Sequence, residues 1–164
     1  MLVALLLAIL NDDGRDVGRG WTLFKNEDDC ALVRSYEGDT LLRVAYTDGL
    51  NDGYVTIADP AFKSIEQGKE YKLKLIFVNG KRLDDGWGEV TGHGFRKDDL
   101  TGVSFKLSGD TLLNDIASNA LLGIFRDDVV VASLRLDGSA AATTELKACA
   151  REVQRENPAD PFAK

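Results

Sequence analysis

Apolar and polar residues alternate over short runs along most of the chain, and clusters of Asp, Asn and Gly separate these runs. Between residues 71 and 77, for example, Tyr71, Leu73, Leu75 and Phe77 are separated by single residues, two of which are lysines. This period of two is typical of an antiparallel strand with one buried face. The pattern predicts eight or nine strands, over residues 21–24, 30–36, 40–46, 54–58, 71–77, 87–91, 102–107, 124–125 and 129–136.

Two stretches depart from the strand pattern and predict helices. Asp110 can cap a short helix near residues 110–119 with three apolar residues on one face: Leu112, Leu113 and Ile116. Ser139 can cap a longer helix near residues 139–156, which ends before Pro158. This second helix carries one apolar stripe, formed by Ala142, Leu146, Cys149 and Val153.

These elements predict a mainly β fold: a single antiparallel β-sandwich or flattened barrel with a packed C-terminal helix. No repeat and no long linker divides the chain, and 164 residues suit one domain. We expect one β-rich domain over residues 17–157, followed by a tail over residues 158–164.

The first ten residues, from Met1 to Leu10, are all apolar and precede Asn-Asp-Asp-Gly. Their number is half of what a transmembrane helix needs. It suits the apolar region of a secretory signal peptide, but no basic residues precede the run and no Ala-x-Ala cleavage site follows it. The interpretation we favour is a signal-peptide remnant, and the alternative is a packed N-terminal strand or helix.

The formal net charge is −7, and 19 of the 27 acidic residues are Asp. Many occur as adjacent pairs between strands, at residues 12–13, 28–29, 84–85, 98–99 and 127–128. Asp is favoured in turns because its side chain bonds to nearby backbone groups. A calcium loop over residues 48–59 fails because Leu50 occupies a ligand position. The acidic balance disfavours a nucleic-acid partner.

The two cysteines allow one covalent hypothesis. Cys30 opens an early strand, and Cys149 lies on the apolar stripe of the last helix. An even number of cysteines and an apolar start both favour export and a Cys30–Cys149 disulfide. The alternative is two buried free thiols.

The layout of Trp21, Cys30, the Leu-Asp-Gly-Ser-Ala-Ala-Ala run at residues 136–142 and Cys149 resembles small exported proteins of proteobacteria. It is distantly similar to the invasion-associated locus B family. The resemblance implies a periplasmic β-sandwich stapled by a disulfide, and it transfers no catalytic residue. The sequence departs from this pattern at its N-terminus.

Few residues are suited to catalysis. His93 is the one histidine, flanked by glycines, and is either a general base or an ordinary surface residue. Trp87, also between glycines, is either a recognition anchor or a core residue. A carboxylate pair for glycoside hydrolysis could come from Asp84 or Asp85 with Glu89. We expect no catalytic residues, no metal site and no cofactor.

The sequence therefore predicts a non-enzymatic, exported interaction or structural module, periplasmic or secreted, with a cytoplasmic location as the alternative. It could be a subunit of a larger envelope assembly with a protein partner. An inhibitor of an extracellular protease or lysozyme is the second interpretation, and a hydrolase is the third. Membrane contact is expected, if anywhere, through residues 1–10.

Overall fold

The computed structural model describes residues 14–79, 82–83 and 87–158. The elements follow one another as β1 (Arg15–Gly18), β2 (Trp21–Lys25), β3 (Cys30–Ser35), the 3-10 turn η2 (Glu37–Asp39), β4 (Leu41–Asp48), β5 (Asp52–Ala58), β6 (Glu70–Asn79), β7 (Arg82–Leu83), β8 (Gly88–Lys97), β9 (Leu100–Leu107), α2 (Thr111–Ser118), β10 (Leu121–Arg126), β11 (Val129–Arg135) and α3 (Ser139–Glu156). The predicted strands and both helices are confirmed, and β1 and β7 are additional short strands. The expected features within residues 1–10, the Asp pairs at 12–13 and 84–85, and the tail beyond Pro158 lie outside the described residues.

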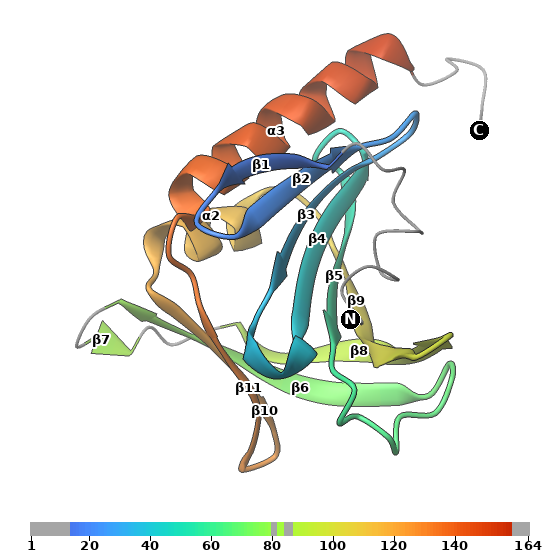
Figure 1. Ribbon diagram of the computed structural model, residues 1–164, viewed down its shortest axis with the longest axis vertical. Helices are drawn as coiled ribbons and strands as arrows, with labels where there is room; N and C mark the ends of the chain where they lie inside the picture. Colours follow the sequence, from blue (N-terminus) through green and yellow to red (C-terminus); the bar gives the residue numbers. More distant parts are fainter. Residues whose placement is uncertain (1–13, 80–81, 84–86, 159–164) are drawn as a thin grey trace.

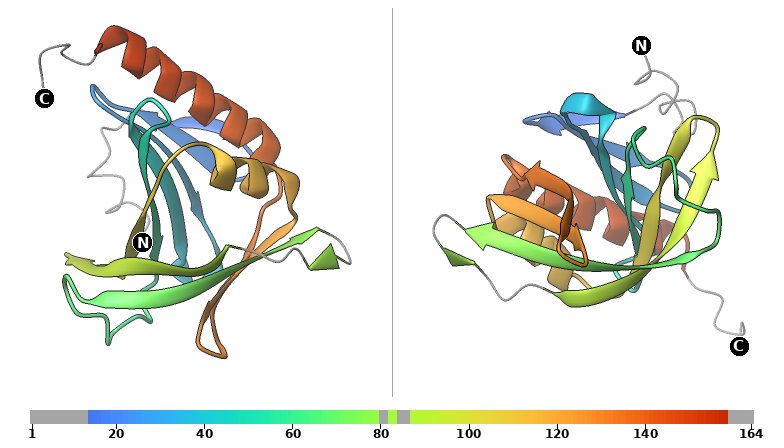
Figure 2. Two further views of the ribbon diagram at one scale, coloured as in Figure 1. Left: turned by 180° about the vertical axis from the view of Figure 1, so that it is seen from behind. Right: turned by 90° about the horizontal axis from the view of Figure 1, so that it is seen from below.

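All strands join one antiparallel sheet in the order β1-β2-β3-β4-β5-β9-β8-β6-β10-β11, with β7 paired to β6 (Figure 1). The predicted mainly β fold with a short helix and a C-terminal helix is therefore confirmed. In place of two stacked sheets or a closed barrel, the strands form one open sheet, because its end strands β1 and β11 do not pair with each other. The sheet bends strongly, so that β6 and β8 run across the direction of β2–β5 (Figures 1 and 2).

Glycines let the sheet bend through β8 and β9. A Cβ on Gly102 would lie 2.2 Å from the carbonyl oxygen of Ile57, and one on Gly92 would lie 2.4 Å from Cγ1 of Val103. Phe95 is the register partner of Gly102 and covers it. Because only glycine permits these close approaches, the bend is encoded at specific positions.

Both helices lie on one face of the sheet, which we call the inner face, and the opposite one is the outer face. The long helix α3 packs across β1–β4, and α2 packs against α3 and β6 (Figure 1). The predicted stripe of α3 is buried in the main core, as are the three apolar residues of α2. The alternation of the strands places a second set of apolar residues on the outer face.

The two predicted helix caps differ from the structure. Gly138, with φ of 78°, precedes α3, and Ser139 is the first helical residue. Its buried hydroxyl donates to the carbonyl oxygen of Ile116 instead, which ties α3 to the end of α2. Asp110 occupies the cap position of α2 but makes no capping hydrogen bond with its side chain. Neither Ser139 nor Asp110 therefore makes the local capping hydrogen bond that was predicted, and each side chain makes a contact with a residue of another helix instead.

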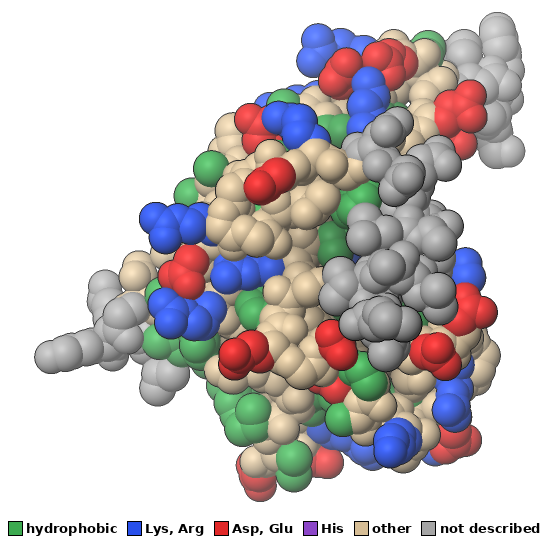
Figure 3. All heavy atoms as spheres, viewed as in Figure 1, with side chains coloured by type: hydrophobic (Ala, Val, Ile, Leu, Met, Phe, Trp, Pro, Cys, Tyr) green, Lys and Arg blue, Asp and Glu red, His purple; other side chains and the backbone are tan. Residues whose placement is uncertain are grey.

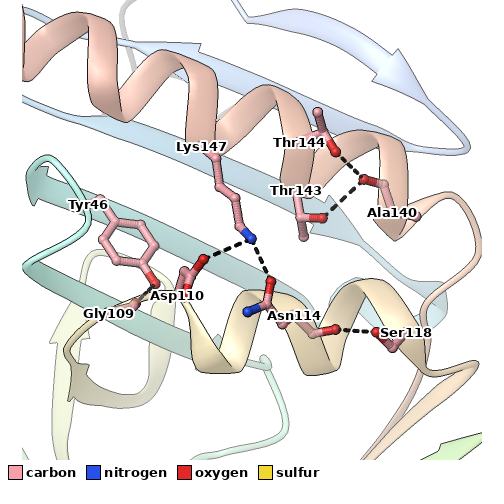
Figure 4. A network of polar contacts seen from close by, with 9 residues as sticks. All are labelled: Tyr46, Gly109, Asp110, Asn114, Ser118, Ala140, Thr143, Thr144 and Lys147. Atoms are coloured by element: carbon pink, nitrogen blue, oxygen red, sulfur yellow. Dashed lines mark hydrogen bonds and ion pairs between the residues drawn. The ribbon is translucent and has the colours of Figure 1, made fainter.

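Lys147 of α3 connects the two helices (Figure 4). Its Nζ lies 3.1 Å from Oδ2 of Asp110 and 2.6 Å from Oδ1 of Asn114. The hydrogen bond and charge of Lys147 lower the pKa of Asp110 below its ordinary value. This contact fixes α2 beneath α3 and explains why Asp110 does not cap its own helix.

The described Asp pairs at 98–99 and 127–128 mark turns, as the sequence predicted. Asp98 and Asp127 adopt positive φ values of 54° and 53° between β8 and β9 and between β10 and β11. Asp tolerates this left-handed region better than most residues with a side chain. At these two turns the Asp residues therefore serve backbone geometry.

Candidate binding surface

Cys30 and Cys149 form a disulfide that joins the start of β3 to α3. Their Cα atoms are 6.1 Å apart, although 119 positions separate them in the sequence. The prediction of this bond is confirmed, and the alternative of two free thiols is wrong. Because such bonds persist in oxidising surroundings, the disulfide indicates an extracytoplasmic compartment. The helices that the structure describes include none long and apolar enough to span a bilayer.

Side chains of β2, of β3 and of Tyr36, which directly follows β3, bridge the gap that the open sheet leaves beside β11. Trp21 Nε1 and Arg34 Nη1 both donate to the carbonyl oxygen of Asp137, at 2.9 and 2.8 Å. The hydroxyl of Tyr36 donates to the carbonyl oxygen of Arg135, at 2.9 Å. The Arg34 guanidinium carbon lies 5.4 Å from the Trp21 ring centre and 5.0 Å from that of Tyr36, which is cation–π geometry. We call Trp21, Arg34 and Tyr36 the aromatic latch.

The tyrosine in this latch and Tyr46 predict a loss of stability at alkaline pH. Burial raises the pKa of Tyr36 to about 12 and the pKa of Tyr46 to about 12. Both hydroxyls donate hydrogen bonds, Tyr46 to the carbonyl oxygen of Gly109 at 2.7 Å. The folded state therefore favours the neutral phenols, and their contribution is complete below pH 10 and is lost as pH rises toward 12.

We expect the melting temperature to fall steeply between pH 10 and 12, and to fall less in the Tyr36→Phe, Tyr46→Phe double variant. Absorbance at 295 nm reports phenolate formation over the same range. Equal alkaline losses in both proteins would contradict the assignment to these two phenols.

Trp87 is half-buried and packs against the main core. Its Nε1 donates to Oδ2 of Asp115 on α2 at 2.6 Å. Its backbone N–H donates to the carbonyl oxygen of Leu75 at 3.1 Å. These contacts favour the interpretation of Trp87 as a core residue over that of a recognition anchor.

His93 lies on the outer face of β8 with its side chain 61% exposed. Its Nε2 lies 3.6 Å from Oε1 of Glu70, its register partner on β6. Ser104 is its register partner on β9, but the Ser104 hydroxyl lies 3.1 Å from that of Thr56. The described contacts of His93 thus contain no hydrogen bond between a nucleophile and a base.

The surroundings of His93 are charged and open. The neighbouring outer-face pairs are Lys72 with Glu89, at 2.8 Å, and Lys106 with Asp52, at 3.0 Å. Glu89 is thereby engaged with a lysine, while Asp84 and Asp85 lie outside the described residues. Within the described ranges, no group of three or more His, Cys, Asp or Glu residues is placed to hold a metal. Trp87 packs on the main core, whereas His93 lies on the outer face, so the two residues do not form one site.

An apolar groove of about 230 Å³ lies on the outer face beside the edge strand β11. Three neighbouring strands line it, with Ile76 and Val78 from β6, Leu121, Gly123 and Phe125 from β10, and Val130, Ala132 and Ser133 from β11. A Cβ on Gly123 would lie 2.9 Å from the Phe125 ring, so the ring leans over the space that the glycine leaves. The groove therefore depends on a glycine at this position.

Next to the groove, the β10–β11 hairpin exposes two apolar side chains, of which Val130 also lines the groove. Val129 and Val130 are 68% and 59% exposed. Figure 3 shows hydrophobic side chains gathered at the lower end of the molecule, where this hairpin protrudes in Figure 1. A bulge lies where Ile124 pairs with Ala132 and Phe125 pairs with Val130. Such bulges redirect side chains at sheet edges.

Sequence reasoning identified this strand but missed its surface. The available signal was three consecutive valines, residues 129–131, placed directly after the Asp127–Asp128 turn, where a hairpin usually carries polar residues. The groove itself had no local signal, because its residues come from strands that meet only in the folded sheet.

Comparisons with family models, with curated proteins and with solved structures gave no match for this chain. The resemblance to the invasion-associated locus B family stays a prediction.

Proposed function

We propose that this protein is a non-enzymatic exported binding module that holds an extended segment of a protein partner along β11. The observation that carries the proposal is the apolar groove of β6, β10 and β11, together with the exposed Val129 and Val130 at the hairpin beside it. Exposed apolar surface of this kind is typical of interaction sites.

The position of the groove favours an extended occupant. Strand β11 pairs with β10 on one side and ends the strand order on the other, so part of its edge can accept another strand. Strand addition combines backbone hydrogen bonds at such an edge with pockets for alternate side chains. At the end of β11 farthest from the hairpin, the carbonyl oxygen of Arg135 already accepts a hydrogen bond from the hydroxyl of Tyr36. The part of β11 nearest the hairpin is therefore the proposed docking edge.

The lining predicts the chemistry of the partner. The groove suits apolar side chains at alternate positions, because Ser133 has the one polar side chain among its lining residues. Asp127 and Asp128 lie at the hairpin tip, next to Val129. We therefore expect a basic residue in the partner beside these carboxylates. An envelope protein with such a segment is the first candidate, since the disulfide indicates an extracytoplasmic compartment.

An inhibitor is the second candidate function, and the protruding β10–β11 hairpin supports it (Figures 1 and 2). An inhibitor would insert this hairpin into the cleft of an extracellular enzyme. The two functions differ in the part that is recognised: the edge and groove for a bound strand, and the hairpin tip for an inserted loop.

The test is selection of displayed 12-residue peptides on the immobilised protein, followed by titration of one enriched synthetic peptide. We expect alternating apolar residues with a basic residue at one end. Val130→Asp should weaken binding at least about tenfold, because it places a charge in the apolar contact. Gly123→Val should do the same by filling the groove.

The matched control is Thr91→Asp, an exposed position on the polar part of the outer face. It adds the same charge on another strand and should leave binding unchanged. Peptides that bind all three variants equally would contradict the proposed function. Binding lost on Asp127→Ala but kept on Gly123→Val would favour hairpin insertion instead.

A further inference from the structure

The two edge strands of the sheet differ in how they are protected from pairing with another chain. Sheet edges usually carry charged residues, prolines or a covering element that prevents such pairing. Edge strand β1 has this protection, because it contains Arg15 and Asp16 and α3 packs on it. Arg15 also pairs with Glu145 of α3 at 2.6 Å. This edge is therefore protected against a further strand.

Edge strand β11 lacks these features over its first part. Residues 129–133 are Val-Val-Val-Ala-Ser and include no charged residue and no proline. Val129 and Val130 are the most exposed of the large hydrophobic residues that the structure describes. An exposed apolar edge of this kind is a site at which chains associate. The contrast between the two edges indicates that β11 is open to pairing.

The backbone of β11 presents hydrogen-bonding groups to its open side. The N–H of Leu136 donates to the carbonyl oxygen of Ala120, on the β10 side of the strand, at 2.9 Å. Successive residues direct these groups to opposite sides, so those of Arg135 point away from β10, where its carbonyl oxygen accepts from Tyr36. The register with β10 is regular here, so the backbone groups of Ser133 also face the open edge. A second strand can therefore pair with β11 between Ser133 and the hairpin.

The charges along the hairpin and β11 allow two copies of this segment to complement each other. Residues 127–135 begin with the carboxylates of Asp127 and Asp128, continue mostly through apolar residues and end with Arg135. All three charged residues are exposed. In an antiparallel pair of β11 strands, Arg135 of each copy lies toward the two carboxylates of the other, and the valines meet between them. A parallel pair would instead bring like charges together.

We propose that β11 of a second copy of this chain pairs antiparallel with the docking edge when no other segment occupies it. The two-fold axis lies near the middle of β11. This inference rests on the proposed function, because it concerns the same edge, and it adds that a partner segment must displace the second copy. The dimer removes the exposed valines from water until such a partner binds.

The aromatic latch limits the length of this interface. The hydroxyl of Tyr36 already binds the carbonyl oxygen of Arg135, so the pairing covers residues 129–133, which span about 17 Å. Interfaces that bury less than about 1,200 Å² are typical of transient complexes. We therefore expect weak, reversible association that depends on the protein concentration.

The test is sedimentation velocity over about a hundredfold range of protein concentration, with two charge-reversed variants. Arg135→Glu places a carboxylate against the two carboxylates of the second copy, and Asp128→Lys places an ammonium against its guanidinium. Each variant alone should raise the dissociation constant of the dimer about tenfold or more, because the two-fold axis repeats every contact. An equimolar mixture of the two should dimerise again, because the two new charges then face each other. A variant that had simply misfolded would not be rescued by mixing.

The matched control is Arg15→Glu at the other edge of the sheet. Arg15 pairs with one carboxylate, as Arg135 does with Asp137 at 3.0 Å, so both variants break one ion pair within the chain. Arg15→Glu should leave the dimer unchanged. Equal weakening by this control, or a mixture of the two charge-reversed variants that dimerises no better than each alone, would overturn the inference.

The inference and the proposed function can fail separately. A protein that stays monomeric at every concentration, but binds an enriched peptide that Val130→Asp and Gly123→Val weaken, would overturn the second copy and leave the proposed function in place. Dimerisation that mixing rescues, without selection of any displayed peptide, would support the second copy and contradict a partner segment. Where both hold, the enriched peptide should dissociate the dimer, and a dimer that persists with the peptide bound would place the second copy elsewhere and overturn the inference.

Discussion

Replacing both Cys30 and Cys149 with alanine is expected to cost about 4–5 kcal/mol of unfolding free energy. The bond closes a loop across 119 positions, so its loss gives the unfolded chain much additional freedom. Domains of this size are stable by only about 5–15 kcal/mol, so this loss removes a large part of the total. Urea unfolding followed by far-UV circular dichroism, with and without reductant, measures the effect.

The single variants Cys30→Ala and Cys149→Ala provide the control. Each breaks the same bond, so each should lose nearly as much stability as the double variant. Reductant should destabilise the wild type and leave the double variant unchanged. Two reactive thiols in denatured, unreduced protein, or single variants as stable as the wild type, would contradict the expected role of the bond.

The elements of this fold were predictable where short-range patterns decide them. The alternation over residues 71–77 corresponds to the buried pattern of β6, in which Tyr71, Leu73, Leu75 and Phe77 face the core. The stripe of α3 predicted that Cys149 faces the sheet, which is the geometry that a disulfide to Cys30 needs. Such features depend on the period of one strand or helix, and a sequence contains that period directly.

The order of the strands was not predictable in the same way. Strand β5 pairs with β9 and β6 pairs with β10, so both contacts join segments far apart in the chain. The groove exists only after this pairing. Sequence reasoning could identify its residues as apolar strand positions, but not as one shared surface.

Trp87 shows a more local limit. A simple alternation would place Trp87 and Glu89 on the same face of β8. Gly88 has φ of 62°, however, and this left-handed residue breaks the alternation, so that Trp87 packs on the core while Glu89 pairs with Lys72 on the outer face. Glycine permits this conformation but does not require it, so the sequence left both interpretations of Trp87 open.

The aromatic latch gives the second large prediction. Trp21→Ala is expected to cost about 3–5 kcal/mol of unfolding free energy, because Trp21 is fully buried and its removal leaves a large cavity. Trp21→Phe should cost less, since the ring is largely replaced while the hydrogen bond to Asp137 is lost. The pair of variants separates packing from the polar contact.

The two tryptophans allow a matched test of what the latch does. Trp21 bridges β2 to Asp137, in the turn that follows β11, whereas Trp87 binds Asp115 on α2. Amide hydrogen exchange in β11 should therefore accelerate in Trp21→Phe and stay unchanged in Trp87→Phe, measured under conditions where both variants are folded. Equal acceleration in both would mean that β11 responds to general destabilisation and that the latch does not hold it. Selective acceleration in Trp21→Phe would show that side chains, in place of backbone pairing, hold the two ends of this open sheet together.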